Sequence, residues 1–222
     1  MSDKEAKGAV REALRFYREK MRELASATYL DTWYSRTEAT TLLEMVKKQE
    51  RKTAQTQLAR VQEKDRLEAF AKLTEVVDGE RRIIHNPPVL FRLEKHEAGI
   101  REWLTELFVG YYQSLEESRK RLLARYRFMD VAHKVVGVGS VGTRCFITYW
   151  QGNDEGDPLF LQVKQASQSL LEPYLGRSEY EQPGRRVITG QRLMQATNDI
   201  FLGYAHSTGH DYFVRQLYDM KG

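Results

Sequence analysis

Apolar positions in the first half of the chain recur with the period of an α-helix. Steps of three and four residues predict a first helix from about 4 to 27 with one apolar side. The same spacing predicts helical segments between 37 and 77 that end at Asp78-Gly79, and helices over 97–115 and 116–126. The apolar positions of the first helix are Val10, Leu14, Tyr17, Met21 and Leu24.

Beyond position 132 the apolar period shortens to that of a β-strand, and three strands, a helix and a final hairpin are predicted in that order. We therefore expect an α+β fold. An N-terminal helical bundle forms a subdomain over 1–131. A five-stranded antiparallel sheet with one packed helix forms a second subdomain over 132–222. The stretch 83–90 should be an extended connection, because its paired prolines disfavour helix. The predicted strands are 133–139, 143–150, 159–165, 202–205 and 212–217, and the helix is 187–201.

The composition is ordinary for a globular protein, with 41% hydrophobic and 30% charged residues. The net charge of +4 suits a ligand that carries phosphate. Cys145 is the single cysteine, which excludes an internal disulfide framework and indicates a reducing compartment, so we expect the cytoplasm. No apolar run approaches the roughly 20 residues of a spanning helix, and no membrane is expected as a partner.

Several residues that could carry chemistry have simpler interpretations. The basic run over 47–66 is interleaved with acidic residues, so a solvated helix face explains it better than nucleic-acid binding. The histidines lack the spacing of metal ligands, so no metal site is predicted. Cys145 occupies a strand position and is interpreted as a small core residue. Arg192 and Arg215 lie beside apolar neighbours and are predicted to form internal ion pairs.

A G-x-G-x-x-G array is formed by Gly137, Gly139 and Gly142. A dinucleotide-binding fingerprint should open a helix, but the residues after Gly142 favour a strand, so the array is predicted to link two strands. Without Cβ atoms, such a hairpin can approach phosphate oxygens and offer backbone N–H donors, as it does in protein kinases. A tight structural turn is the alternative interpretation.

Lys164 ends the apolar segment Phe160-Leu-Gln-Val-Lys164, twenty-two residues after Gly142. An ammonium group in such a strand is costly to bury without an anionic partner. On a kinase-like sheet it would meet the α- and β-phosphates of a nucleotide. The alternative is an edge lysine whose charged end reaches water.

Long phrases of the sequence resemble a bacterial family known as domain of unknown function 2252. They are Val135-Val-Gly-Val-Gly-Ser-Val-Gly-Thr-Arg144, Asp157-Pro-Leu-Phe-Leu-Gln-Val-Lys164, Gly190-Gln-Arg-Leu-Met-Gln195 and Tyr212-Phe-Val-Arg-Gln-Leu-Tyr-Asp-Met-Lys-Gly222. The resemblance implies a kinase-like protein, similar to aminoglycoside and homoserine phosphotransferases, whose sheet is like a kinase N-lobe. It implies a site for ATP and Mg²⁺. The nucleotide-binding residues would be Gly137, Gly139, Ser140 and Gly142 over the phosphates, Lys164 on them, and Leu217, Tyr218, Asp219 and Met220 beside the adenine.

The chain departs from the family pattern in ways that bear on catalysis. Family members look permuted, with the catalytic-loop and metal-binding segments upstream of the helices present here, and this chain has neither. The helix expected to supply a glutamate for Lys164 offers Gln191 and Gln195, and Glu172 is another possible partner. We therefore expect an ATP-binding portion that is incomplete and inactive alone, with no catalytic residue and no Mg²⁺ ligand of its own. The alternative is a non-catalytic interaction module that docks on the missing catalytic segment or self-associates.

Overall fold

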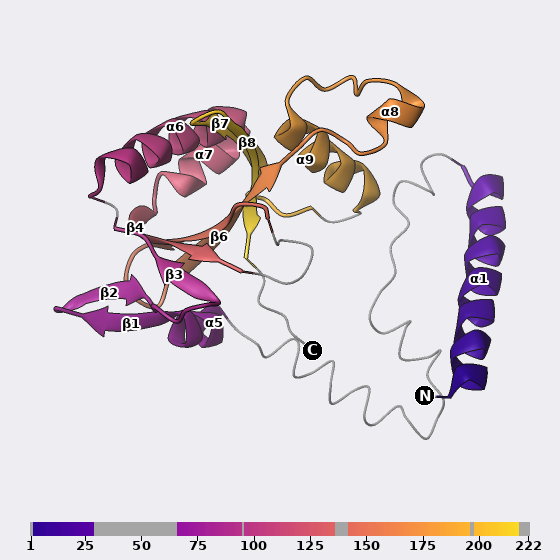
Figure 1. Cartoon of the computed structure of the whole chain (residues 1–222), viewed down its shortest axis with the longest axis horizontal. Coiled ribbons are helices and arrows are strands. Elements are labelled where there is room, and N and C mark those ends of the chain that lie inside the picture. Colours follow the sequence, from indigo (N-terminus) through magenta and orange to yellow (C-terminus); the bar gives the residue numbers. More distant parts are fainter. Residues whose placement is uncertain (1, 29–65, 95, 136–141, 196–197, 218–222) are drawn as a thin grey trace. The chain divides into compact units, whose positions relative to one another are not determined.

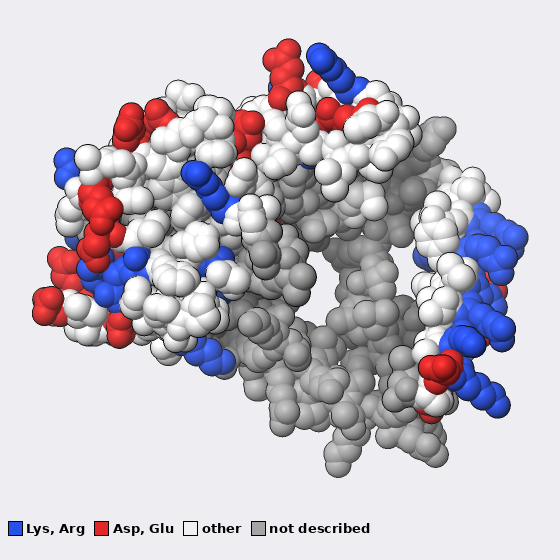
Figure 2. Space-filling view, viewed as in Figure 1, with Lys and Arg blue, Asp and Glu red and all other residues white. Residues whose placement is uncertain are grey.

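The computed structural model describes residues 2–28, 66–94, 96–135, 142–195 and 198–217, and the chain divides into two compact units, Met1–Lys47 and Lys48–Gly222 (Figure 1). In the first unit, helix α1 (Asp3–Ser26) confirms the helix predicted from 4 to 27. Ser2 and Glu5 form a capping box, in which the Ser2 hydroxyl accepts from the Glu5 N–H and the Glu5 carboxylate accepts from the Ser2 N–H at 2.6 Å. The apolar side of α1 is exposed, and its basic residues gather on another side (Figure 2).

The second unit is built on an antiparallel sheet of six strands in the order β3-β4-β5-β6-β8-β7. The fold is α+β, as predicted, and a strand is found near each of the five predicted positions. The first is displaced: it was predicted over 133–139, and the observed strand β4 covers Arg127–Lys134, so the two overlap only at 133–134. The sixth strand, β3, was not predicted, and it begins at the last residue of the extended connection expected over 83–90. The bounds are β3 (Leu90–Arg92), β4 (Arg127–Lys134), β5 (Cys145–Gln151), β6 (Pro158–Ala166), β7 (Gly203–Ser207) and β8 (His210–Gln216).

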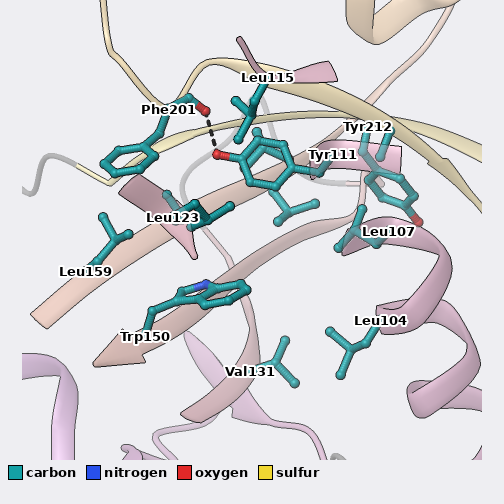
Figure 3. Close-up of a cluster of buried hydrophobic side chains, with 14 of the residues drawn as sticks. Leu104, Leu107, Tyr111, Leu115, Leu123, Val131, Trp150, Leu159, Phe201 and Tyr212 are labelled. Carbon is teal, nitrogen blue, oxygen red and sulfur yellow. Dashed lines mark hydrogen bonds between the residues drawn. The ribbon is translucent and has the colours of Figure 1, made fainter. Parts of the chain in front are cut away.

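One face of this sheet packs against helix α6 (Ala98–Ser114), which is followed by the short α7 (Glu117–Leu123). Leu107 and Tyr111 of α6 are fully buried there, among leucines, valines and aromatic rings of the strands (Figure 3). The Tyr111 hydroxyl donates to the carbonyl of Phe201 at 2.8 Å. The helical periodicity over 97–115 therefore marks the side of α6 that covers the sheet.

The opposite face is partly covered by helix α5 (Arg66–Leu73) and by a hairpin of β1 (Thr74–Val77) and β2 (Glu80–Ile83). The prediction that the helix continues to Val77 is wrong, because Thr74 starts a strand. Asp78 and Gly79 have φ of 52° and 78°, the backbone of a tight hairpin turn between twisted strands. The helical prediction between 37 and 65 lies outside the described residues.

Helix α9 (Pro183–Met194) begins earlier and ends earlier than the predicted 187–201. Proline at its first position has no N–H to leave unpaired, and the Gln182 side chain accepts from the Arg185 N–H at 2.5 Å. It contacts β6, β7 and β8 and follows the one-turn helix α8 (Glu172–Leu175). The compositional boundary between 131 and 132 stays a prediction.

Candidate anion-binding face of the sheet

The register of the sheet brings three cationic side chains to one face. Lys164 of β6 lies directly opposite Cys145 of β5, and Arg215 of β8 lies opposite Gln162 of β6. Because His133 pairs with Phe146, the next position, Lys134 of β4, is level with Cys145. Directly opposed residues point to the same side of a sheet, and residues two apart on one strand share a face. Lys134, Lys164 and Arg215 therefore surround Cys145 on one face.

The electrostatics of Cys145 show that the three charges act on one point. Burial raises the pKa of its thiol, and the positive charges of Lys164, Lys134 and Arg215 oppose that rise. Its side chain is almost fully buried and its pKa stays above the ordinary value, so the thiol is neutral at pH 7. A buried, neutral thiol agrees with the interpretation of Cys145 as a core residue. The electrostatic potential at its sulfur is made positive by the three nearby cations.

Lys164 and Arg215 are half-buried, and no carboxylate of the described residues forms a salt bridge with either. Arg215 instead donates from Nε to Gln162 Oε1 at 3.1 Å, and the Gln162 side chain is buried. The predicted internal ion pair of Arg215 is therefore wrong within the described part of the chain. Arg192 also donates to a carbonyl, that of Leu202, at 3.1 Å. Half-buried cations without a carboxylate partner favour an external anion.

The glycine array joins two neighbouring strands, as predicted. Strand β4 ends at Lys134, β5 begins at Cys145, and the two pair antiparallel. Gly142 has φ of 80°, a backbone conformation that favours glycine, and it is exposed. Gly137, Gly139 and Ser140 lie outside the described residues. The array is therefore followed closely in the sequence by Cys145, the first residue of β5, which lies opposite Lys164 of β6.

Within the part of the chain that the structure describes, no hydrogen bond or salt bridge joins Lys164 to the other predicted site residues. Leu217 donates its N–H to the Phe160 carbonyl at 2.9 Å and packs at the edge of the core, which continues β8 alongside β6. Gln191 lies half-buried on α9, Gln195 is exposed at the C-terminal cap of that helix, and Glu172 lies on α8. Tyr218, Asp219 and Met220 lie outside the described residues.

Sequence reasoning missed Lys134, Arg215 and Gln162 as neighbours of Lys164. The available signal was the alternation within each strand, which puts Gln162 on the same face as Lys164. Alternation does not say which residue of another strand lies beside Gln162. Its partner Arg215 is 53 residues away in the sequence.

A cavity of about 300 Å³ lies elsewhere, between α8 and the start of α9. Two acidic residues, Glu172 and Glu181, and two basic residues, Arg177 and Arg186, contribute to its lining. Arg186 already donates to the Ser167 carbonyl at 2.8 Å. The balanced charge makes this cavity a poorer match for a polyanion than the sheet face.

The fold and this face define an α+β protein with a cationic sheet face beside a glycine-rich connection. The chain matches over residues 1–222 the family described as an uncharacterized protein conserved in bacteria (DUF2252), and it belongs to this family. No curated protein and no solved structure matches the chain. Among the described helices, none is long and apolar enough to cross a membrane. The described residues hold no group of three or more His, Cys, Asp or Glu side chains suited to a metal ion.

Proposed function

We propose that the chain is the ATP-binding portion of a kinase-like phosphotransferase-family protein. The observation that carries this proposal is the position of Lys164, level with Cys145 on the strand that the glycine array enters. Protein kinases cover the phosphates with a glycine-rich loop between two strands and place a lysine on the third strand. Here β4, β5 and β6 are three consecutive antiparallel neighbours, and Lys164 lies on the third.

In this proposal, different residues of the site bind different parts of the nucleotide. Backbone N–H groups of Gly137, Gly139, Ser140 and Gly142 face the phosphates, and the Lys164 ammonium binds the α- and β-phosphates. Residues 217–220 lie beside the adenine. Transfer of the γ-phosphate needs a base and Mg²⁺ ligands, for which this sequence offers no matching segment, so we propose binding without phosphoryl transfer by this chain. The free buried thiol of Cys145 suits a reducing compartment, and we place the protein in the cytoplasm.

Calorimetric titration with ATP and Mg²⁺ tests the proposal. We expect Lys164→Met to weaken binding at least about tenfold, or about 1.4 kcal/mol, since it removes a half-buried charge and keeps the length of the side chain. Gly139→Val should weaken binding similarly, because its Cβ branches block the close approach of phosphate. The matched control is Lys72→Met, an exposed position on α5, which should stay within about twofold of the parent chain. Absence of binding heat in the folded parent chain would refute the proposal.

The absence of phosphoryl transfer has its own test. Radiolabelled ATP with Mg²⁺ should give no labelled protein and no hydrolysis above the buffer rate. A labelled product that disappears in Lys164→Met would show instead that the chain is an active enzyme.

A second candidate function is a non-catalytic interaction module, favoured by exposed apolar side chains on and around α8 and at the end of α9. Leu170, Tyr174 and Met194 are 89%, 83% and 86% exposed. Exposed apolar side chains of this size often contact a partner. Light scattering should then show concentration-dependent self-association that Tyr174→Glu reduces. A monomer at all concentrations, with no binding of a hydrophobic dye, would contradict this function.

A further inference from the structure

We propose that Arg215 and Lys134 bind the same anion as Lys164, so that cations from three strands grip one linear polyphosphate. The ligand class is an anion with at least three negative charges along a chain, such as the triphosphate of a nucleotide. This inference deepens the proposed function and rests on it for the identity of the site.

The spacing of the strands matches such a chain. Neighbouring strands lie about 4.8 Å apart, so Lys134 and Lys164, two strands apart, are separated at their backbones by about 10 Å. Arg215 is diagonal to Lys164 across β6 and β8, since Phe213 is the residue directly opposite Lys164. Diagonal neighbours lie about 7–8 Å apart, within reach of long side chains. Flexible ammonium groups and a guanidinium at these positions can converge on successive phosphates of one extended ligand.

Arg215 is oriented for this role by a buried partner. Its Nε–H donates to Gln162 Oε1, and Gln162 is only 2% exposed, so the amide is fixed in the sheet. The bond holds one edge of the guanidinium and leaves its terminal nitrogens, for which the structure describes no carboxylate partner, to form paired hydrogen bonds with phosphate oxygens. A guanidinium fixed in this way loses little entropy when an anion binds.

Acidic groups on this face are committed elsewhere. The buried carboxylate of Asp130, four residues before Lys134, accepts from the Ile83 N–H at 2.9 Å and pairs with Arg82 at 3.4 Å. Asp211, near the other edge, pairs with His206 at 2.9 Å and accepts from Gln182 at 3.2 Å. Neither forms a salt bridge with Lys164 or Arg215, so the local charge around these two residues favours an anion, and a longer phosphate chain gains more from it.

The experiment compares inorganic phosphate, pyrophosphate and tripolyphosphate by calorimetry on the full chain, in low salt with EDTA. We expect affinity to rise along this series, and Arg215→Gln and Lys134→Gln each to weaken tripolyphosphate binding at least about fivefold. Arg215→Lys should recover part of the loss, because it restores the charge without the paired hydrogen bonds. Arg121→Gln, an exposed position on α7, is the control and should stay within about twofold. Circular dichroism confirms that each variant is folded.

The outcomes separate this inference from the proposed function. If Lys164→Met weakens ATP binding but Arg215→Gln, Arg215→Lys and Lys134→Gln bind tripolyphosphate like the parent, the shared grip is wrong and nucleotide binding stands. If tripolyphosphate binds through Arg215 and Lys134 but ATP binds no better than tripolyphosphate, the grip stands and the nucleotide assignment is wrong. If neither ligand binds the folded parent chain, both are wrong.

Discussion

Replacing Gly184 with alanine tests how closely helix α9 approaches the sheet. Gly184 is the second residue of α9 and is buried. A Cβ added there would lie 2.8 Å from the backbone carbonyl carbon of Tyr212 and closer still to its oxygen. Tyr212 belongs to β8, pairs with neighbours on both sides and is fully buried, so its backbone has no room to retreat. The helix itself must move away from the strand.

The size of the effect follows from two opposing terms. Overfilling a packed interior costs about 1–3 kcal/mol, and more when backbone is displaced. Alanine gains at most about 1 kcal/mol over glycine inside a helix, and less in the first turn. We therefore expect Gly184→Ala to lower the free energy of unfolding by about 1–2 kcal/mol. Gly190→Ala is the matched control on the same helix, because its added Cβ would meet nothing within 4 Å apart from its chain neighbours and the backbone of its own helix. It should raise the free energy of unfolding by about 0.5–1 kcal/mol.

Urea unfolding followed by tryptophan fluorescence is a suitable assay, since Trp103 and Trp150 are buried in the core of this unit. Amide hydrogen exchange along α9 adds a local measurement, and protection there should fall in Gly184→Ala and rise in Gly190→Ala. If Gly184→Ala unfolds at the same urea concentration as Gly190→Ala, the close approach of α9 to Tyr212 is wrong.

Two further predictions concern ionisable groups. Asp130→Asn should lower the free energy of unfolding by about 1.5–3 kcal/mol, because it removes the buried carboxylate charge that faces the half-buried Arg82, which then keeps only its more exposed partner Glu94. Glu155→Gln, which affects only an exposed pair with Arg81, should cost less than about 1 kcal/mol in urea unfolding, and equal losses would contradict the reasoning. Burial raises the folded-state pKa of Cys145, so its contribution to stability is complete below about pH 8.5, where the unfolded thiol begins to ionise, and is lost as pH rises through the folded pKa. The parent chain should therefore lose more stability between pH 7.5 and 9.5 than Cys145→Ala, and identical losses would show that the thiol is not responsible.

The sequence predicted those elements whose period and end signals agree. Helices α1 and α6 have long apolar stripes, β5 is rich in β-branched and aromatic residues, and β6 contains a short apolar run, so their types and approximate bounds were correct. The hairpin at Asp78-Gly79 was missed because Val76 and Val77 continue the helical spacing by coincidence. The Asp-Gly pair itself, a strong hairpin signal, was interpreted as a helix end.

The candidate site divides in the same way between local and non-local information. Lys164 could be identified from its own strand, since a lysine in an apolar strand is conspicuous in one short segment. Arg215 could not, because its neighbours depend on the order in which distant strands pair. An ion pair was the default expectation for an arginine among apolar residues. The observed partner of Arg215 is the neutral amide of Gln162. Because this amide carries no negative charge, the positive charge of Arg215 is not neutralised by it.

The two ends of the sheet face that carries Lys164 differ in a way that bears on binding. At one end, Tyr149 and Phe160 stack, and α5 with the β1–β2 hairpin covers them. Asp130 fastens that hairpin to β4 through the Ile83 N–H. At the end nearer the glycine array, the same strands present cations around Cys145 in place of apolar side chains. A group of like charges is destabilising for folding alone, so the well-packed end supplies stability that the cationic end does not. Rigid strands fixed at one end are the support that an anion site needs to hold its cations in place before the ligand arrives.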